Sequence, residues 1–511
     1  MKLRMAKLAV LLASLTAVVL TAGAAVHEQN LEKSFEVKPG GKLFIKADRG
    51  SIKVATGETE KVQVHVFQNV NGGGKARAEE LLANHEVTFG QDGNTVSVTA
   101  KNLKQQGVSW SFGKPGLEVS YQVSIPRKFN VELHTAGGDI VLADLEGEAS
   151  THTSSGAIKL SKVAGKAEAR NSGGDISAQE VGGEMIARTS SGRINIHKVK
   201  GRLEASNSGG DIDVEAVDGD LTAQTSSGRM TVGVIGGDVE AKNSGGDIQI
   251  ASADGSAIAE TSSGSIHLGL IKGKSTNAKN SGGSIRIDKA EGDVATQTSS
   301  GAIIIGTTEG NVEAKNSGGD ITIQNAAGTV VVRTSSGLIE IGSAKGRVEA
   351  QDSGGDIRIG EAGSELAART SSGNIVVKQA RGKVEAKNSG GNVEISDARE
   401  AVVAQTSSGA IQVNFFTAPK SDSRLEVSGG GISVGLPKAA GVELDAHSSG
   451  GSIRSDLPVT MEVRGSQRGD KMQGRINGGG PTLFLRSSSG NIKVKQLAAA
   501  VGPAENEESR K

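Results

Sequence analysis

The 511-residue chain contains no cysteine and almost no aromatic residues. The absence of cysteine excludes disulfides, thiol nucleophiles, thiolate metal sites and a lipid-modified cysteine. Aromatic residues form only 2% of the chain, which excludes a thick globular core. Proline occurs 8 times and glycine 73 times, but no Gly-X-Y period is present, so the chain is not collagen. Regularly recurring Val and Ile argue equally against disorder.

The chain also lacks an excess of either charge. Lys plus Arg and Asp plus Glu both number 57. A balanced chain has no long-range field that would steer nucleic acid or anionic lipid toward it. The sequence therefore gives no indication of a nucleic-acid-binding protein.

The N-terminus has the pattern of a secretory signal. Lys2, Arg4 and Lys7 form a basic segment, an apolar run follows over residues 8–20, and Ala22-Gly23-Ala24 supplies small residues for cleavage. The apolar run is too short to span a bilayer comfortably, and no second one follows. We expect cleavage near Ala24 or Ala25, no transmembrane segment afterwards, and export to the periplasm, the cell surface or the medium.

Residues 26–128 do not repeat. Alternating runs at residues 42–46, 62–67 and 95–99 predict strands with one buried face, and residues 73–85 predict one short helix. Most of the few aromatic residues lie here or near the C-terminus. This segment is expected to be a β-rich cap.

The segment from residue 129 to 414 is built on an 18-residue period. Thr-Ser-Ser-Gly-x-Ile turns alternate with Asn-Ser-Gly-Gly-Asp-Ile turns, as at residues 189–194 and 207–212. Within one period the apolar residues occupy offsets 0, 2, 5, 9 and 11 from the turn Ile: Ile194, Ile196, Val199, Leu203 and Ala205. Pairs two residues apart share one face of a strand, whereas a helix needs spacings of three and four. Each period therefore predicts two short strands and two corners.

Such periods are too short to fold alone and must stack in parallel. The sequence predicts an all-β fold, a single-stranded parallel β-helix (β-solenoid) with coils of about 18 residues and two short strands per coil. A small β-rich N-terminal cap region with one short helix precedes it. Pairs of opposite charge lie two residues apart on the outer face of one strand, and we interpret them as a solvated face. They are Glu168 and Arg170, Glu240 and Lys242, Glu313 and Lys315, and Glu385 and Lys387.

Two corner positions receive specific roles, and one turn is irregular. The Gly two residues before each Ile, such as Gly192 and Gly210, is expected to adopt positive φ. The Thr or Asn at offset 13, such as Thr225 and Asn243, is expected to point inward and satisfy backbone groups of the corner. A turn that comes one residue late at Asn280 suggests a β-bulge.

After residue 414 the strict period fails, although turn-plus-Ile signatures recur at wider spacing. We expect larger coils with loops, with Phe415, Phe416 and Phe484 closing the open end of the stack. The resulting division is a signal peptide (1–25), a β-rich N-terminal cap region (26–128), a regular 18-residue-repeat solenoid (129–414), irregular C-terminal coils and cap (415–497) and a disordered tail (498–511).

No residue is identified as catalytic, cofactor-binding or metal-ligating, and no cofactor is expected. Many β-helices cleave acidic polysaccharides with clustered carboxylates, but the corner Asp recurs every second coil and is replaced by Ser284 and Asn392, whereas a catalytic pair must be unique. Calcium is a disfavoured alternative, because the nonapeptide calcium roll needs a nine-residue period. The histidines form no i,i+4 pair and no His-x-His, which gives metal catalysis no support. A corner Asp that accepts a backbone hydrogen bond is favoured instead.

These turns resemble the bacterial DUF4097 family, whose members are labelled candidate adhesins. The resemblance rests on the repeated turns, on the entry segment at residues 34–41 and on Ile476-Asn-Gly-Gly-Gly480 before Ser487-Ser-Ser-Gly-Asn-Ile492. It implies an exported β-solenoid without catalytic residues to carry over, and some relatives are linked to envelope stress.

Three hypotheses follow. The first is an exported, non-enzymatic scaffold, an adhesin-like binding or structural protein of the bacterial cell envelope, whose partner is a protein or polysaccharide of that envelope. The second is an envelope-stress sensor or partner protein. The third is a carbohydrate-active β-helix enzyme, which requires a non-periodic acidic cleft.

Overall fold

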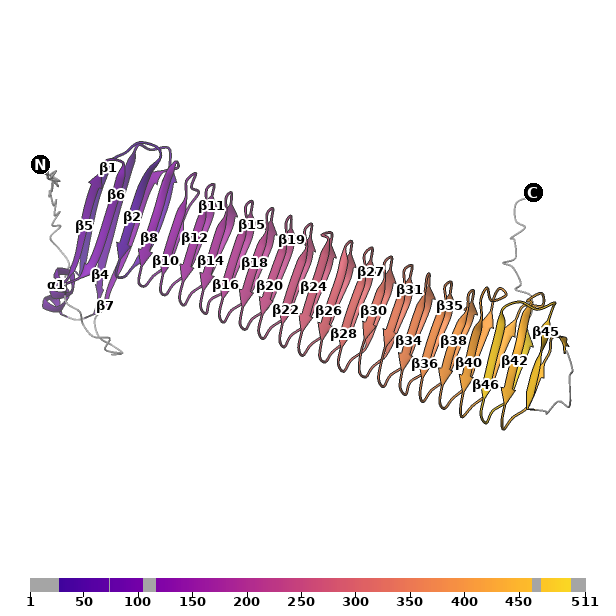
Figure 1. The fold of residues 1–511 in the computed structure, drawn as a ribbon. Helices are drawn as coiled ribbons and strands as arrows, with labels where there is room; N and C mark the ends of the chain where they lie inside the picture. The colour runs from indigo at the N-terminus through magenta and orange to yellow at the C-terminus, as the bar shows by residue number, and fades with distance from the viewer. Residues whose placement is uncertain (1–26, 73, 104–115, 462–469, 498–511) are drawn as a thin grey trace, which may run out of the picture. The chain divides into compact units, whose positions relative to one another are not determined.

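The structure, a computed structural model, describes residues 27–72, 74–103, 116–461 and 470–497. The predicted signal peptide, the predicted tail and Trp110 lie outside these residues. The chain divides into two compact units, Met1–Asn171 (unit 1) and Ser172–Lys511 (unit 2). The sequence-based boundaries after residues 128 and 414 stay predictions. The described residues are all-β apart from one helix and form a parallel β-solenoid after a β-rich N-terminal region, as predicted (Figure 1).

Unit 1 contains the helix α1 (Lys75–Ala83), inside the segment predicted as helical, and α1 packs against β4 and β5. Its strands are β1 (Glu28–Glu36), β2 (Gly41–Ala47), β3 (Ser51–Gly57), β4 (Lys61–Asn71), β5 (His85–Asp92), β6 (Thr95–Asn102), β7 (Gly116–Pro126), β8 (Phe129–Thr135), β9 (Ile140–Leu142), β10 (Ala149–Thr153), β11 (Ile158–Val163) and β12 (Ala167–Asn171).

The strand order of unit 1 departs from the order of the sequence. In one sheet β1 pairs antiparallel with β4 and β4 antiparallel with β7, and then β3 pairs parallel with both β7 and β9. In the other sheet β5 pairs antiparallel with β6, and β2 pairs parallel with both β6 and β8. The coil made of β2 and β3 is thus inserted between two coils that follow it in sequence.

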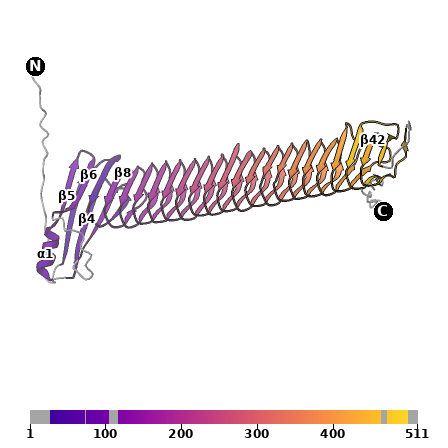
Figure 2. The same cartoon turned by 60° about the horizontal axis from the view of Figure 1, so that its bottom comes forward.

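Unit 2 stacks its coils along one axis, each with one strand in sheet A and one in sheet B (Figures 1 and 2). The sheet A strands are β13 (Ile176–Val181), β15 (Ile194–Val199), β17 (Ile212–Val217), β19 (Met230–Ile235), β21 (Ile248–Ala253), β23 (Ile266–Ile271), β25 (Ile285–Ala290), β27 (Ile303–Thr308), β29 (Ile321–Ala326), β31 (Ile339–Ala344), β33 (Ile357–Ala362), β35 (Ile375–Ala380), β37 (Val393–Ala398), β39 (Ile411–Phe415), β41 (Ile432–Leu436), β43 (Ile453–Ser455) and β47 (Ile492–Gln496).

The sheet B strands of unit 2 are β14 (Met185–Thr189), β16 (Leu203–Asn207), β18 (Leu221–Thr225), β20 (Val239–Asn243), β22 (Ala257–Thr261), β24 (Ser275–Asn280), β26 (Asp293–Thr298), β28 (Val312–Asn316), β30 (Val330–Arg333), β32 (Val348–Gln351), β34 (Leu366–Thr370), β36 (Val384–Asn388), β38 (Val402–Thr406), β40 (Ser423–Val427), β42 (Val442–Ser448), β44 (Val459–Thr460), β45 (Lys471–Ile476) and β46 (Thr482–Ser487).

The register follows the predicted period. Ile194 pairs with Ile212 and Leu203 with Leu221, so equivalent side chains lie above one another in successive coils. The five predicted inward residues of this coil are each at most 1% exposed. A fully buried Ile, Val or Leu side chain contributes roughly 1.5–3 kcal/mol through the hydrophobic effect, so these ladders stabilise every coil. The predicted outward charge pairs are confirmed as ion pairs at Glu168–Arg170, Glu240–Lys242, Glu313–Lys315 and Glu385–Lys387.

The prediction that every corner glycine adopts positive φ is only partly right. Gly228, Gly337 and Gly409 have the expected positive φ, but Gly192 and Gly210 do not. The shared reason for glycine is the close approach of successive coils. A Cβ on Gly337 would lie 2.6 Å from the carbonyl oxygen of Gly319 in the preceding coil, a distance that no real Cβ adopts. Glycine is therefore required by the stacking of backbone on backbone.

The C-terminal end has a strand order for which the sequence analysis made no prediction, and it corrects the role predicted for three phenylalanines. Strands β46 and β47 do not follow β44 and β45 in space: β46 pairs parallel with β40 and β42, and β47 with β41 and β43. The last coil in sequence is thus inserted between two earlier ones, and β45 pairs antiparallel with β42 and β44. Phe415 is buried, but Phe416 is 53% exposed and Phe484 lies on the inserted β46, so these side chains do not close the end.

The predicted bulge at Asn280 is also wrong. Strands β22 and β24 pair without a register shift, from Ala257 with Thr276 to Thr261 with Asn280. The additional residue lies between Ile271, which pairs with Ala253, and Thr276, which pairs with Ala257. The corner thus accommodates the insertion at no cost in strand pairing.

Candidate functional site

The predicted inward Thr and Asn column is confirmed as a backbone-satisfying ladder. Thr225 Oγ1 donates a hydrogen bond to the carbonyl of Gly210 (3.1 Å), and Asn243 Nδ2 donates to that of Gly228 (2.7 Å). Each acceptor belongs to the corner of the preceding coil. Asn243 Oδ1 also accepts the backbone N–H of Gly245 at 3.1 Å. These side chains therefore have a structural role in each corner.

The corner Asp column is confirmed in the turn role. Asp211 Oδ1 accepts the backbone N–H of Arg229 at 2.9 Å, and Asp247 Oδ1 accepts that of Ser265 at 2.8 Å. Hydrogen bonds from these backbone N–H groups are the main reason that the pKa of Asp211 and that of Asp247 lie below the ordinary carboxyl range. The substitutes Ser284 and Asn392 accept the N–H of Ala302 and Ala410 in the same way. Each of these side chains therefore links its own coil to the coil that follows, once in every two coils.

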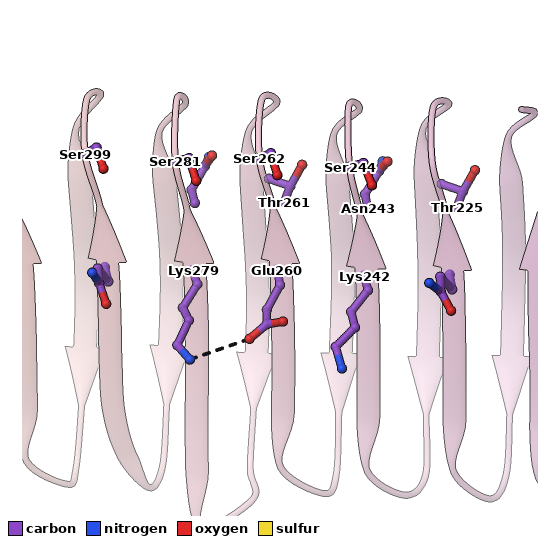
Figure 3. Close-up of a pocket in the computed structure, with 13 residues that line it drawn as sticks. Thr225, Lys242, Asn243, Ser244, Glu260, Thr261, Ser262, Lys279, Ser281 and Ser299 are labelled. Carbon is purple, nitrogen blue, oxygen red and sulfur yellow. Dashed lines mark ion pairs between the residues drawn. The ribbon is translucent and has the colours of Figure 1, made fainter. Parts of the chain in front are cut away.

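Next to these corners, an open polar groove of about 460 Å³ runs across several coils of sheet B (Figure 3). One wall is a row of exposed serines, Ser244, Ser262, Ser281 and Ser299, one directly after each inward Thr or Asn. Within the described residues, the hydroxyls of these four serines make no hydrogen bond to the protein. They are consequently available to donate to and accept from a bound molecule.

The other wall of this first groove is a column of long polar side chains at the position before the inward Thr or Asn: Gln224, Lys242, Glu260, Lys279 and Gln297. Lys279 Nζ and Glu260 lie 3.6 Å apart (Figure 3). The groove thus offers hydroxyls, amides and both charges in a fixed order, with no apolar floor.

A second groove, of about 630 Å³, has the same construction in the coils of residues 387–488. Its serine wall includes Ser389, Ser407, Ser428, Ser449 and Ser488. Its other wall includes Lys387, Gln405, Glu426, His447 and Arg486. Sequence reasoning placed the turns correctly but missed the grooves. The available signal was a serine after every inward Thr or Asn, which in a stack becomes a continuous row.

One non-periodic polar cluster lies inside unit 1. The buried His85 bridges two groups, with Nδ1 2.6 Å from Gln68 Nε2 and Nε2 3.2 Å from Asp48 Oδ1. Burial lowers the pKa of His85, although Asp48 opposes this effect. In the same unit the hydroxyl of Tyr121 is buried without a hydrogen-bond partner, and burial raises its pKa. With the His85 side chain 0% exposed, the cluster is read as part of the packing of unit 1.

Several histidines that are scattered in the sequence stay apart in the structure. His65, His197 and His267 each lie against one carboxylate, those of Glu32, Glu215 and Asp288. His134 and His152 are the exception, because they pair in register on the adjacent strands β8 and β10. The spacing of 18 residues, one coil, was the signal that a search for i,i+4 pairs overlooks.

Among the described helical residues, none form a helix that is both long and apolar enough to cross a membrane. The described part of the chain likewise contains no group of three His, Cys, Asp or Glu side chains placed to hold a metal ion.

Comparison with known proteins identifies the family. The profile described as "Toastrack DUF4097" matches residues 41–236, 235–396 and 362–495. No curated protein matches the chain significantly. A solved structure of a candidate cell adhesion protein from Clostridium sporogenes is 9% identical, with a TM-score of 0.15, over 92% of this chain and 100% of that one.

Two further solved structures are candidate adhesins. The protein from Bacteroides fragilis is 15% identical with a TM-score of 0.19, over 56% of this chain and 97% of its own. The protein from Parabacteroides distasonis is 10% identical with a TM-score of 0.20, over 61% of this chain and 97% of its own.

Proposed function

Because the chain belongs to the DUF4097 family, we propose that it is an exported, non-enzymatic scaffold of the bacterial cell envelope that binds an extended polar polymer along sheet B. The observation that carries the proposal is the first groove, with its row of unpaired serine hydroxyls. Coils in a parallel stack repeat about every 4.8 Å. A polymer laid along the groove therefore meets a serine hydroxyl at every coil, and weak contacts add up along its length.

The chemistry of the groove favours a polysaccharide of the envelope over an apolar peptide. Its walls present Ser hydroxyls, Gln amides and the paired charges of Lys279 and Glu260. Such groups replace the hydrogen bonds that sugar hydroxyls make with water, whereas an apolar side chain would find no matching surface. The corner carboxylates, the candidates for hydrolysis, occur in every second coil and accept backbone hydrogen bonds, as at Asp211 and Asp247. This supports a binding role without turnover.

The test is a binding screen of the purified mature protein against envelope polysaccharides, with groove variants for each polymer that binds. Ser262→Trp places a large side chain in the groove at an exposed position. The matched control is Gln249→Trp, exposed on β21 of sheet A beside the same coils. We expect Ser262→Trp to weaken binding at least about tenfold, a change typical of a lost central contact, and Gln249→Trp to leave it unchanged.

Two results would overturn the proposal. One is that no polysaccharide in a broad panel binds, or that binding is the same in both variants. The other is reproducible depolymerisation that survives repurification, which would make the chain an enzyme. Export is tested separately, by the mass of the protein recovered from the envelope fraction. The expected mass lacks residues 1–24 or 1–25, and recovery of the full-length chain in the cytosol would contradict export.

A further inference from the structure

His134 on β8 and His152 on β10 form a pair of imidazoles on the outer surface of unit 1. The two residues are register partners in a parallel ladder, so both side chains leave the same face one coil apart. Their ring centroids are 5.9 Å apart and their planes are inclined by 42°. Stacked equivalent positions in unit 2 carry Ser, Gln, Glu, Lys, Arg and one histidine, His447, which lies beside Arg486. Two histidines in adjacent coils of this column are therefore not a product of the repeat.

A carboxylate adjoins the pair. Glu132 Oε1 lies 3.1 Å from Nε2 of His134, and these two side chains are 31% and 35% exposed. The other oxygen of Glu132 pairs with Lys42 Nζ at 2.6 Å, which fixes the carboxylate in place. Two imidazoles and one carboxylate are a donor set that divalent transition metals accept.

From these distances we propose that Glu132, His134 and His152 bind one divalent transition-metal ion of the imidazole-preferring class, such as Zn²⁺, Cu²⁺ or Ni²⁺. A nitrogen and an oxygen bound to one tetrahedral ion, each about 2.0–2.2 Å from the metal, are about 3.3 Å apart. Glu132 and His134 already have nearly this separation. Two imidazoles on one such ion have centroids about 5 Å apart.

The His152 ring must therefore approach by less than an ångström and turn its nitrogen toward the ion. Within the described residues no hydrogen bond restrains this ring. No three such donors have already converged in the described residues, so the site closes on binding.

Two cations flank the pair in the same column. Lys46 is the register partner of His134, and Arg170 that of His152. Arg170 is neutralised in part by its ion pair with Glu168, and Lys42 by its ion pair with Glu132. Lys46 has no such partner among the described ion pairs, so its charge opposes an incoming cation. This arrangement yields a distinctive expectation, because removal of Lys46 should tighten metal binding.

The experiment is a calorimetric titration of the untagged full chain with Zn²⁺. We expect saturable binding of one ion per chain, weakened at least about tenfold by His134→Gln or His152→Gln, the range typical when a metal site loses an interaction. His197→Gln is the matched control, an exposed histidine beside one carboxylate, and should leave binding unchanged. Lys46→Gln should strengthen binding. Thermal unfolding of the metal-free variants should equal that of the parent chain, since all four side chains point outward.

A second probe counts the imidazoles directly. With Cu²⁺, electron paramagnetic resonance should show coupling to two imidazole nitrogens in the parent chain and to one in His152→Gln. Absence of saturable Zn²⁺ binding would overturn the proposal, and so would unchanged affinity in His152→Gln or equal losses in His197→Gln. This outcome is independent of the polysaccharide screen, because the site lies in unit 1 and the grooves lie in unit 2.

Discussion

Asp352 occupies a column whose neighbours in the adjacent coils are Thr334 and Thr370 and whose counterparts two coils away are Asn316 and Asn388. Its Oδ1 accepts the backbone N–H of Gly354 at 3.0 Å, as an Asn Oδ1 does. Its Oδ2 is buried and has no hydrogen-bond partner, whereas Asn388 Nδ2 donates to a corner carbonyl at 2.6 Å. Where Asn388 has an NH₂ group that donates to a corner carbonyl, Asp352 has a second carboxylate oxygen, which cannot donate. The carboxylate oxygen and the corner carbonyl are thus two acceptors without a donor between them.

We expect Asp352→Asn to raise the free energy of unfolding, because the new amide donates to the carbonyl that the carboxylate leaves unserved. The gain should be about 1 kcal/mol, the usual net value of one hydrogen bond. Urea unfolding of the two proteins measures it. The reverse change, Asn388→Asp, is the control and should lower the stability by a similar or larger amount. A destabilised Asp352→Asn protein would refute this account of the column.

At the scale of the coil, the inward ladder and the outward face differ sharply in tolerance. Ile321 on β29 is 0% exposed and pairs with Ile303 and Ile339 in the neighbouring coils. Ile321→Asp would place a charge among aliphatic side chains without a partner, and should cost several kcal/mol. In a stack whose coils contact only their neighbours, such a defect should also split one thermal transition into two.

The control for this change is Thr322→Asp, one residue along the same strand and on its outer face. Its unfolding temperature should stay within a degree or two of the parent value, as is usual for surface substitutions. Calorimetry of both variants measures the difference. Equal stability of Ile321→Asp and the parent chain would mean that the inward face has been assigned to the wrong residues.

The coils at the ends show that the residue pattern of a strand does not determine which strands it pairs with. Residues 482–496 carry the same alternation as any other coil, and nothing in that alternation states which coils they lie between. Parallel pairing requires only a matching face and register, and β40 and β42 both provide these to β46. The same holds in unit 1, where β2 lies between β6 and β8, although both of these strands follow it in sequence.

For the whole molecule, the regular part of the fold was predictable because the apolar residues of one 18-residue period indicate which positions are strands, which are corners and which point inward. The inward set around Ile194, the Thr and Asn ladder and the backbone role of Asp211 all follow from phase and side-chain chemistry. The column of corner glycines was predicted, but for an incomplete reason. A preference for positive φ can be inferred from the turn sequence, whereas the close approach of successive coils cannot. The grooves and the His134–His152 pair depend on which residues stack, and became visible only with the coils assembled.

Acidification should destabilise unit 1 before it affects the carboxylate ladders. Burial lowers the folded-state pKa of His85 below its unfolded value of about 6.5. The unfolded chain then binds the proton more tightly, so the stability is complete above about pH 6.5 and declines as the pH falls below it. Asp48 and Arg49 are the charges that act on this ring.

The measurement is the unfolding temperature of the parent chain and of His85→Gln between about pH 7.5 and 5, a range set by the histidine pKa. The parent chain should lose stability over this interval, and His85→Gln should lose less. Parallel pH profiles would show that His85 does not contribute. The carboxylates act later, because Glu385, with a pKa that Lys387 and Arg369 lower to about 2, loses its stabilising charge only toward that pH.

The inserted coil at the C-terminal end of unit 2 has a genetic consequence. Since β46 and β47 complete the end by pairing with β40 to β43, that end is built the same way however many coils precede it. Tandem duplication or loss of a two-coil block such as residues 172–207 keeps the alternation of Thr and Asn turns and every register intact. Recombination between repeats that adds or removes such a block would therefore change the length of the array and leave its C-terminal end intact.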